Sequence, residues 1–207
     1  MPLPSDLGPV PFALELRSEA RPLREGRGGR PLPTPAPFGG LLSDLRTIHA
    51  RGFRGSWTLR LGPLALSLST QKDLDGIEEL WVFLLELVDA GHGEWSLHES
   101  GDSEDPLVIE AQRFGPDVNL EFGRESGPPR FRGKALPRRA TVRLRALVEE
   151  GAALLEKLLA EAASLEPALG ARSEARGLRE DMQALRDAVK ELPRDWRRSA
   201  TASLEAP

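Results

Sequence analysis

In the middle of the chain, the spacing of apolar residues changes from strict alternation to intervals of three and four. This change constrains the fold more than any other feature. Residues 57–68 alternate apolar and polar side chains around Gly62-Pro63, as a hairpin with one buried face does. Apolar residues then recur at spacings of three and four over 74–88, which is typical of an amphipathic helix. Because such a helix must bury its apolar side, the two patterns together predict an α+β fold.

Later segments extend the predicted sheet. Residues 95–97, 107–111 and 118–122 alternate again, and a further short strand is expected at 130–134. Thr70 and Asp73 have the spacing of a capping box before the helix, and Gly91 stands where its C-terminal cap belongs. The order β-β-α-β-β-β, built from hairpins, predicts a mainly antiparallel sheet with one helix packed on it.

The C-terminal part is predicted to be a helical hairpin. Pro137 suits a helix start, and one apolar stripe runs from Leu144 to Leu169. A second stripe runs from Leu178 to Trp196. The exposed seams of two such helices need partners, which packing within the chain, a homodimer or a partner helix could each provide.

Composition divides the chain into three parts. Residues 1–50 form a Pro/Gly/Arg-rich arm with a short predicted strand at 12–17, a linker at 21–40 and about two helical turns at 41–50. Residues 51–136 form the α+β core, and residues 137–207 the helical hairpin.

Several chemistries are disfavoured by residue content. Cysteine is absent, which excludes disulfides, thiol nucleophiles and cysteine metal sites and suits a reducing compartment. The first residues lack a signal-peptide pattern and no long apolar run follows, so a cytoplasmic protein without a membrane span is expected. Arginine outnumbers lysine by 24 to 4, which a high-GC bacterial genome explains.

Catalytic and cofactor motifs are also missing. His49, His92 and His98 have no recognised metal-ligand spacing, and no phosphate-binding loop or serine elbow is present. We therefore expect no cofactor and no metal. An enzyme is disfavoured, although a fold could still assemble a carboxylate or histidine site.

Acidic residues form two candidate partner-binding groups. Glu78 and Glu79 are expected on the outer side of the helix, and Asp102, Glu104 and Asp105 in a loop that lacks the residue order of a calcium site. The structural alternative for both groups is a solvated surface. Residues 51–136 contain 9 basic and 15 acidic residues, a net charge of −6.

Basic residues form a third candidate group around Arg138, Arg139 and Arg143, within a run from Arg130 to Arg145. We expect this run to lead from the last strand into the first turns of the long helix. Cations there oppose the helix dipole, a cost that binding an acidic partner or pairing with nearby glutamates could offset. The chain's net charge of −4 and the lack of interleaved aromatic residues disfavour nucleic acid.

The segment 80–122 resembles a group of small uncharacterised bacterial α+β proteins. The resemblance rests on W-x-F-L-x-E-L, E-W-x-L, L-x-I-x-A and V-x-L-x-F, and the segment that contains them covers a fifth of the chain. Some proteins of this group are immunity-like and neutralise a cognate toxin. The resemblance implies a stoichiometric inhibitor whose acidic surface suits a basic toxin, and it assigns no site residues.

The sequence therefore predicts a non-enzymatic protein-binding protein, with an immunity-like inhibitor as the leading hypothesis. The first alternative is a dimeric scaffold or secretion-adaptor subunit that associates through the C-terminal helices.

Overall fold

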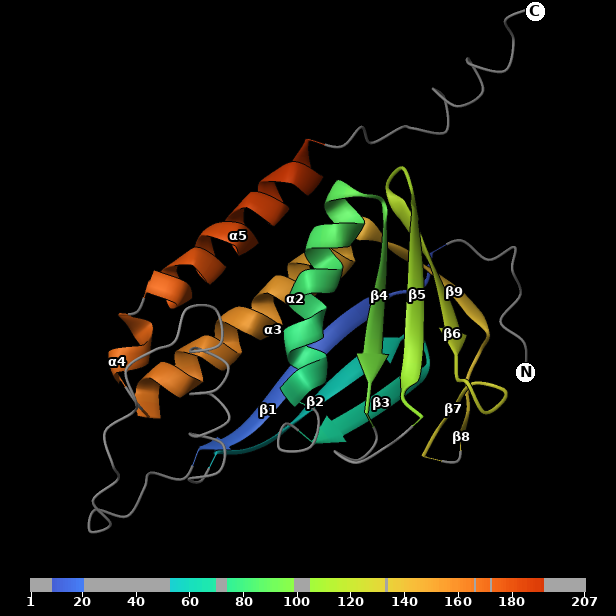
Figure 1. The fold of residues 1–207 in the computed structure, drawn as a ribbon, viewed down its shortest axis with the longest axis horizontal. Coiled ribbons are helices and arrows are strands. Elements are labelled where there is room, and N and C mark those ends of the chain that lie inside the picture. Colours follow the sequence, from blue (N-terminus) through green and yellow to red (C-terminus); the bar gives the residue numbers. More distant parts are fainter. Residues whose placement is uncertain are drawn as a thin grey trace, which may run out of the picture.

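The computed structural model describes residues 9–20, 53–69, 74–98, 105–132, 134–165, 167–171 and 173–191. These residues form antiparallel sheets and helices, which confirms the predicted α+β fold (Figure 1). The helical turns expected at 41–50 and the capping-box residues Thr70 and Asp73 lie outside the described residues.

Sheet A consists of three strands in sequence order, β1 (Phe12–Ala20), β2 (Phe53–Leu61) and β3 (Leu64–Ser69). The predicted hairpin is confirmed as β2 and β3, and Gly62 in its turn has a φ of 54°. The strand expected in the N-terminal arm is also confirmed, and it pairs with β2 along its whole length. Where side chains of the three strands are described, alternate apolar residues are buried, namely Phe12, Leu14, Leu16, Trp57, Leu59, Leu61, Leu66 and Leu68.

Sheet B consists of four strands in the order β4 (His92–Leu97), β5 (Leu107–Phe114), β6 (Asp117–Gly123) and β9 (Arg139–Arg143). Where one strand was expected at 130–134, the chain forms a small hairpin of β7 (Arg130–Phe131) and β8 (Lys134–Ala135).

The prediction that a helix begins at Pro137 is wrong, because residues 139–143 form a strand. Ala140 and Val142 face the core, whereas Arg139 and Arg143 face outward. Strand β9 pairs with β6, and the N–H of Phe122 donates to the carbonyl of Arg138. The long helix starts only after this strand has ended.

The helices are α2 (Leu74–Asp89), α3 (Leu144–Leu165), the single turn α4 (Pro167–Gly170) and α5 (Ser173–Lys190). Gly91, with a φ of 79°, follows the end of α2 as predicted. Arg113 of β5 donates from Nη1 to the carbonyl of Val88, 2.8 Å away, and so satisfies one of the last acceptors of that helix.

The core lies between the inner faces of the two larger sheets. Trp57 of β2 stacks on Trp95 of β4 with 5.5 Å between ring centroids, and Phe83 of α2 lies 5.8 Å from Trp95. The indole N–H of Trp95 donates to the carbonyl of Gly76, 2.6 Å away. One rigid aromatic residue thus contacts both sheets and α2.

Strand β1 is held by α3. The N–H of Leu14 donates to Glu150 over 3.2 Å, and Lys157 donates to the carbonyl of Leu16 over 2.6 Å. These side chains satisfy backbone groups on the side of β1 that has no neighbouring strand, a position where unpaired groups would otherwise invite another chain.

Helices α3 and α5 form the predicted C-terminal helical hairpin (Figure 1). Arg186 of α5 makes two hydrogen bonds to Glu156 of α3, at 2.5 and 2.8 Å. Four residues of the second predicted stripe are buried within the single chain, namely Leu178, Met182, Leu185 and Val189. Leu192 and Trp196, which end that stripe, lie outside the described residues.

Candidate interaction surface

The outer face of sheet B is a polar surface built from alternate residues of four strands. In β5, Leu107, Ile109 and Ala111 are buried, whereas Glu110 and Gln112 point the other way and are exposed. The other three strands alternate in the same sense, because side chains of a strand point to opposite faces in turn, although Asp117 at the start of β6 is also buried. One face therefore lines the core and the other meets solvent.

Three carboxylates form a row across this outer face, which we call the acidic row: Glu94, Glu110 and Glu121. The register places Glu94 of β4 opposite Glu110 of β5, and Glu110 opposite Glu121 of β6. All three are exposed. Like charges directly opposite one another destabilise a sheet, so the row carries a cost within the free molecule.

One end of the acidic row is neutralised by β9. Arg139 lies opposite Glu121, and its guanidinium donates to both carboxylate oxygens at 3.2 and 3.3 Å. For Glu94 and Glu110 the described residues supply no comparable ion pair. The negative charge therefore remains on β4 and β5.

The neighbouring positions on the outer face include polar groups, the half-buried Val108 and an aromatic ring. Asn119 accepts a hydrogen bond from Thr141 at 2.9 Å, and Asp117 pairs with Arg143 at 2.6 Å. Phe114, at the end of β5, is 42% exposed. An exposed aromatic ring beside charged groups is common at protein–protein interfaces.

Two of the three basic site residues predicted from the sequence lie on this face. Arg139 and Arg143 project from β9 and form the cross-strand pairs with Glu121 and Asp117, instead of opposing a helix dipole as expected. Arg138 is exposed in the bend before β9. The structure thus brings these arginines to the acidic surface rather than to the start of a helix.

The predicted acidic candidates have different positions. Glu79 accepts the backbone N–H of Ser96 at 3.0 Å, so it binds the edge of β4 that has no neighbouring strand instead of facing only solvent. Glu78 belongs to α2, but its side chain lies outside the described part of the structure, as do the loop residues Asp102 and Glu104.

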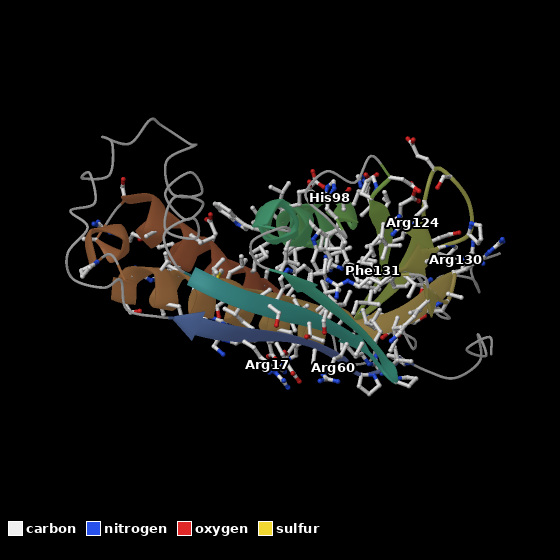
Figure 2. All side chains as sticks on the ribbon, turned by 90° about the horizontal axis from the view of Figure 1, so that it is seen from below. Arg17, Arg60, His98, Arg124, Arg130 and Phe131 are labelled. Atoms are coloured by element: carbon white, nitrogen blue, oxygen red, sulfur yellow. The ribbon has the colours of Figure 1, made fainter. Side chains whose placement is uncertain are left out.

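Asp105, which precedes β5, has a structural role, because it bonds to the turn that follows β6. Its carboxylate accepts hydrogen bonds from the hydroxyl of Ser126 and the backbone N–H of Glu125. The Arg124 guanidinium donates to the backbone carbonyl of Asp105 at 2.6 Å. Figure 2 shows Arg124 and Arg130 at this end of sheet B. The Ser126 hydrogen bond is the main reason why the pKa of Asp105 lies below its usual value, with the Arg124 charge contributing less.

The described part of the chain contains neither a cluster of metal-ligating side chains nor a helix that could cross a membrane. No group of three or more histidine, aspartate or glutamate side chains there is placed to hold a metal ion. His92 is exposed on β4 and His98 is partly buried at its end. None of the described helices has the length and apolar character needed to cross a membrane.

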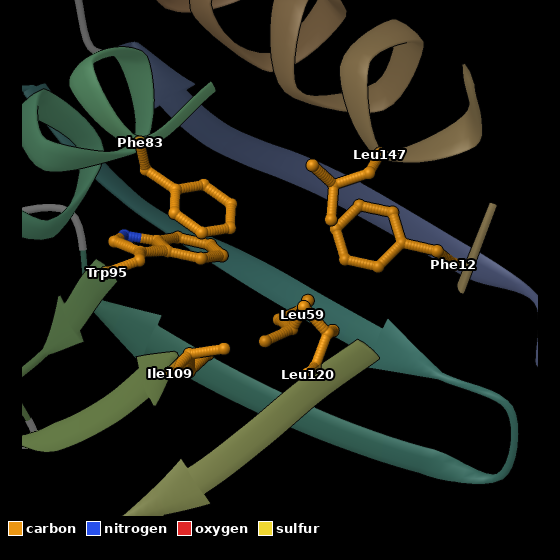
Figure 3. A pocket seen from close by; sticks show the side chains of 7 residues that line it. All are labelled: Phe12, Leu59, Phe83, Trp95, Ile109, Leu120 and Leu147. Atoms are coloured by element: carbon orange, nitrogen blue, oxygen red, sulfur yellow. The ribbon is translucent and has the colours of Figure 1, made fainter. Parts of the chain in front are cut away.

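A small apolar cavity lies inside the core, between the two sheets and the helices (Figure 3). Its lining contains no ionisable group, and it consists of Phe12, Leu59, Phe83, Trp95, Ile109, Leu120 and Leu147. A void of this kind can affect packing, but it offers no polar group to orient a substrate.

The chain matches no family model, no curated protein and no solved structure in the comparisons made.

The residues of the acidic row are not among the site residues predicted from the sequence. The signal that could have found them is the alternation of β4, β5 and β6, which assigns Glu94, Glu110 and Glu121 to the outward side. What the alternation lacks is the strand register, which alone puts the three residues in line.

Proposed function

We propose that this protein is a non-enzymatic protein-binding protein, an immunity-like stoichiometric inhibitor of a basic toxin or effector in a bacterial cell. Inhibition would occur by occlusion, since a complementary surface can cover the partner's site without any bond being made or broken.

The main observation in support of this proposal is the acidic row. Glu94 and Glu110 stand opposite each other on adjacent strands, and among the described residues neither has an ion pair. A partner that placed lysine or arginine side chains over them would relieve their mutual repulsion and gain charge-assisted hydrogen bonds. Such charges also raise the rate of association with a basic protein.

The neighbouring groups suit a protein partner better than nucleic acid. Arg139, Arg143 and Arg145 are already paired with carboxylates of the chain, so part of the basic run is neutralised. Phe114 offers an exposed apolar contact at the end of the same face. Carboxylates at the centre of the surface would repel a phosphate backbone.

The dimeric-scaffold alternative relied on an uncovered seam on the second C-terminal helix. Leu178, Met182, Leu185 and Val189 are buried within one chain, which favours packing inside the molecule for this part of the stripe.

Affinity capture with paired variants tests the proposal. The bait is the full chain, either unchanged or with Glu94→Lys and Glu110→Lys, and captured proteins are quantified by mass spectrometry. A control with Glu180→Lys and Glu191→Lys makes the same charge change at exposed residues in α5 and just after it.

We expect a basic partner to be captured stoichiometrically by the unchanged chain and the control, and to be lost from the sheet variant. The purified partner's activity should fall to zero at an equimolar ratio. Equal capture by both variants, or a captured protein whose activity is unaffected, would contradict the proposal.

A further inference from the structure

The edge strands of the two larger sheets differ in whether their outward backbone groups are hydrogen-bonded. On β1, Leu14 and Leu16 are bonded to side chains of α3, and on β4 the N–H of Ser96 is bonded to Glu79. On β9, the carbonyl of Thr141 accepts the N–H of Val10 at 2.8 Å. Three of the four edges are therefore engaged by other described parts of the chain.

The fourth edge is β3, and the hydrogen bonds of its neighbours show which groups point away from the sheet. The N–H of Gly62 donates to the carbonyl of Pro11. The backbone N–H and carbonyl groups of Arg60, Thr58 and Ser56 therefore also point toward β1. The backbone groups of the residues between them point toward β3. Leu61, Leu59 and Trp57 thus pair with Leu64, Leu66 and Leu68.

The outward backbone groups of β3 consequently belong to Ala65, Ser67 and Ser69. Within the described ranges, no residue bonds to the N–H or carbonyl groups of Ala65 and Ser67. Both side chains are small and exposed. A second strand could approach this edge without a steric obstacle from either of them.

Strand β3 also lacks the residues that keep edge strands apart. Its sequence, LALSLS, contains no charge and no proline, and its pairing with β2 is regular from Leu64 to Ser69 without a bulge. Natural sheets discourage edge-to-edge pairing by placing lysine, proline or bulges on free edges. By contrast, β1 contains glutamate and arginine.

We infer that β3 is a self-association edge, at which a second copy of this chain adds its own β3 in antiparallel orientation. A twofold axis at Ser67 pairs this residue with itself and pairs Ala65 with Ser69. Their backbone N–H and carbonyl groups then form the ladder, and two copies of sheet A become one continuous sheet.

The second copy fits this edge because the strand is complementary to itself. No charged side chain of β3 faces its symmetry mate, and the small residues Ala65 and Ser67 meet small residues across the axis. The leucines fall on the inner side in both copies, so the apolar and polar faces of the sheet continue across the interface. The contact does not use the acidic row.

A single engineered cysteine tests the geometry directly, because the chain contains none of its own. Residues in a directly opposed hydrogen-bonded pair have Cα atoms about 5.5 Å apart, which is within reach of a disulfide. We expect Ser67→Cys to form an interchain disulfide under mild oxidation. Ala135→Cys, an exposed strand residue on β8, should not.

Sedimentation velocity of the full chain over a range of concentrations gives the second test. We expect a monomer–dimer equilibrium that Ala65→Lys shifts to monomer, whereas the matched control Ala135→Lys leaves it unchanged. Circular dichroism and thermal unfolding confirm that both variants are folded. A monomer at every concentration, a dimer that persists in Ala65→Lys, or equal cross-linking of both cysteine variants would each overturn the inference.

Discussion

The two stacked tryptophans differ in what their indole N–H groups meet. Trp95 donates to the carbonyl of Gly76 in the first turn of α2, whereas the buried N–H of Trp57 has no hydrogen-bond partner among the described residues. Both rings are at most 2% exposed. The same residue type therefore contributes packing at one position, and packing together with a buried hydrogen bond at the other.

Replacing each tryptophan with phenylalanine should separate these contributions. Trp95→Phe removes a buried hydrogen bond to the carbonyl of Gly76, so we expect a loss of about 0.5–1.5 kcal/mol beyond the cost of the smaller ring. Trp57→Phe makes the same change of size without that loss. Urea unfolding of both variants measures the difference, and equal destabilisation would show that the Trp95 hydrogen bond contributes nothing.

Acidic residues show how far the sequence could predict the candidate site. Alternation assigns Glu110 to an outward position, but it cannot tell that Glu94 and Glu121 flank it on other strands. Likewise, Glu79 bonds to Ser96 and Asp105 to Ser126, partners that lie 17 and 21 residues away. Tertiary structure sets such contacts, so local patterns predict exposure but not pairing.

At the scale of elements, the hairpin and the helix ends were predictable because their signals are local. Gly62-Pro63 and Gly91 mark turns by their own chemistry. Strand β9 was missed because it runs directly into α3, without a turn, from Arg143 to Leu144. The inward face of α2 was also only partly predictable, since this helix is apolar on most sides and Leu80 and Leu87 are more deeply buried than Trp81 and Val88.

Two glycines in helices allow the packing of these elements to be tested. A Cβ at Gly151 of α3 would lie 2.7 Å from Cδ1 of the fully buried Leu84, whereas a Cβ at Gly177 of α5 would meet nothing within 4 Å. Alanine is the better helix former by about 1 kcal/mol.

We therefore expect Gly177→Ala to stabilise the protein by about 0.5–1 kcal/mol. Gly151→Ala should destabilise it by about 1 kcal/mol net, because overpacking between α2 and α3 outweighs the gain in helix propensity. Thermal and urea unfolding measure both effects, and stabilisation by Gly151→Ala would mean that α2 and α3 can separate at little cost.

At the scale of the whole molecule, long-range contacts join parts that the sequence divides. The N-terminal strand β1 belongs to sheet A and is held by α3, and Val10 before it bonds to Thr141 of β9. The arm and the C-terminal segment thus complete the structure around the central residues. Composition placed boundaries near residues 50 and 136. The alternation at 12–17 predicted a strand before the first boundary, whereas the strand at 139–143, beyond the second, was predicted to be part of a helix.

The ion pair between α3 and α5 should make the attachment of the last helix depend on pH. Hydrogen bonds from Arg186 are the main cause that lowers the pKa of Glu156 below its ordinary value, with the charge of Arg186 adding to the effect. Because the pKa of Glu156 is lowered in the folded protein, this stabilisation is fully present above the pKa of a glutamate in the unfolded chain, about 4.3. It is lost as the pH falls through the lower folded-state value.

Arg186→Met removes the pair while keeping an apolar side chain of similar length. Because Glu156 is partly exposed to water, we expect a modest loss of about 0.5–1 kcal/mol at neutral pH. That difference from the unchanged protein should shrink as the pH falls below about 4. Urea unfolding across this pH range measures it, with Arg176→Met as the control for an exposed arginine on the same helix. A difference that stays constant down to low pH would show that Arg186 acts through packing and not through its bond to Glu156.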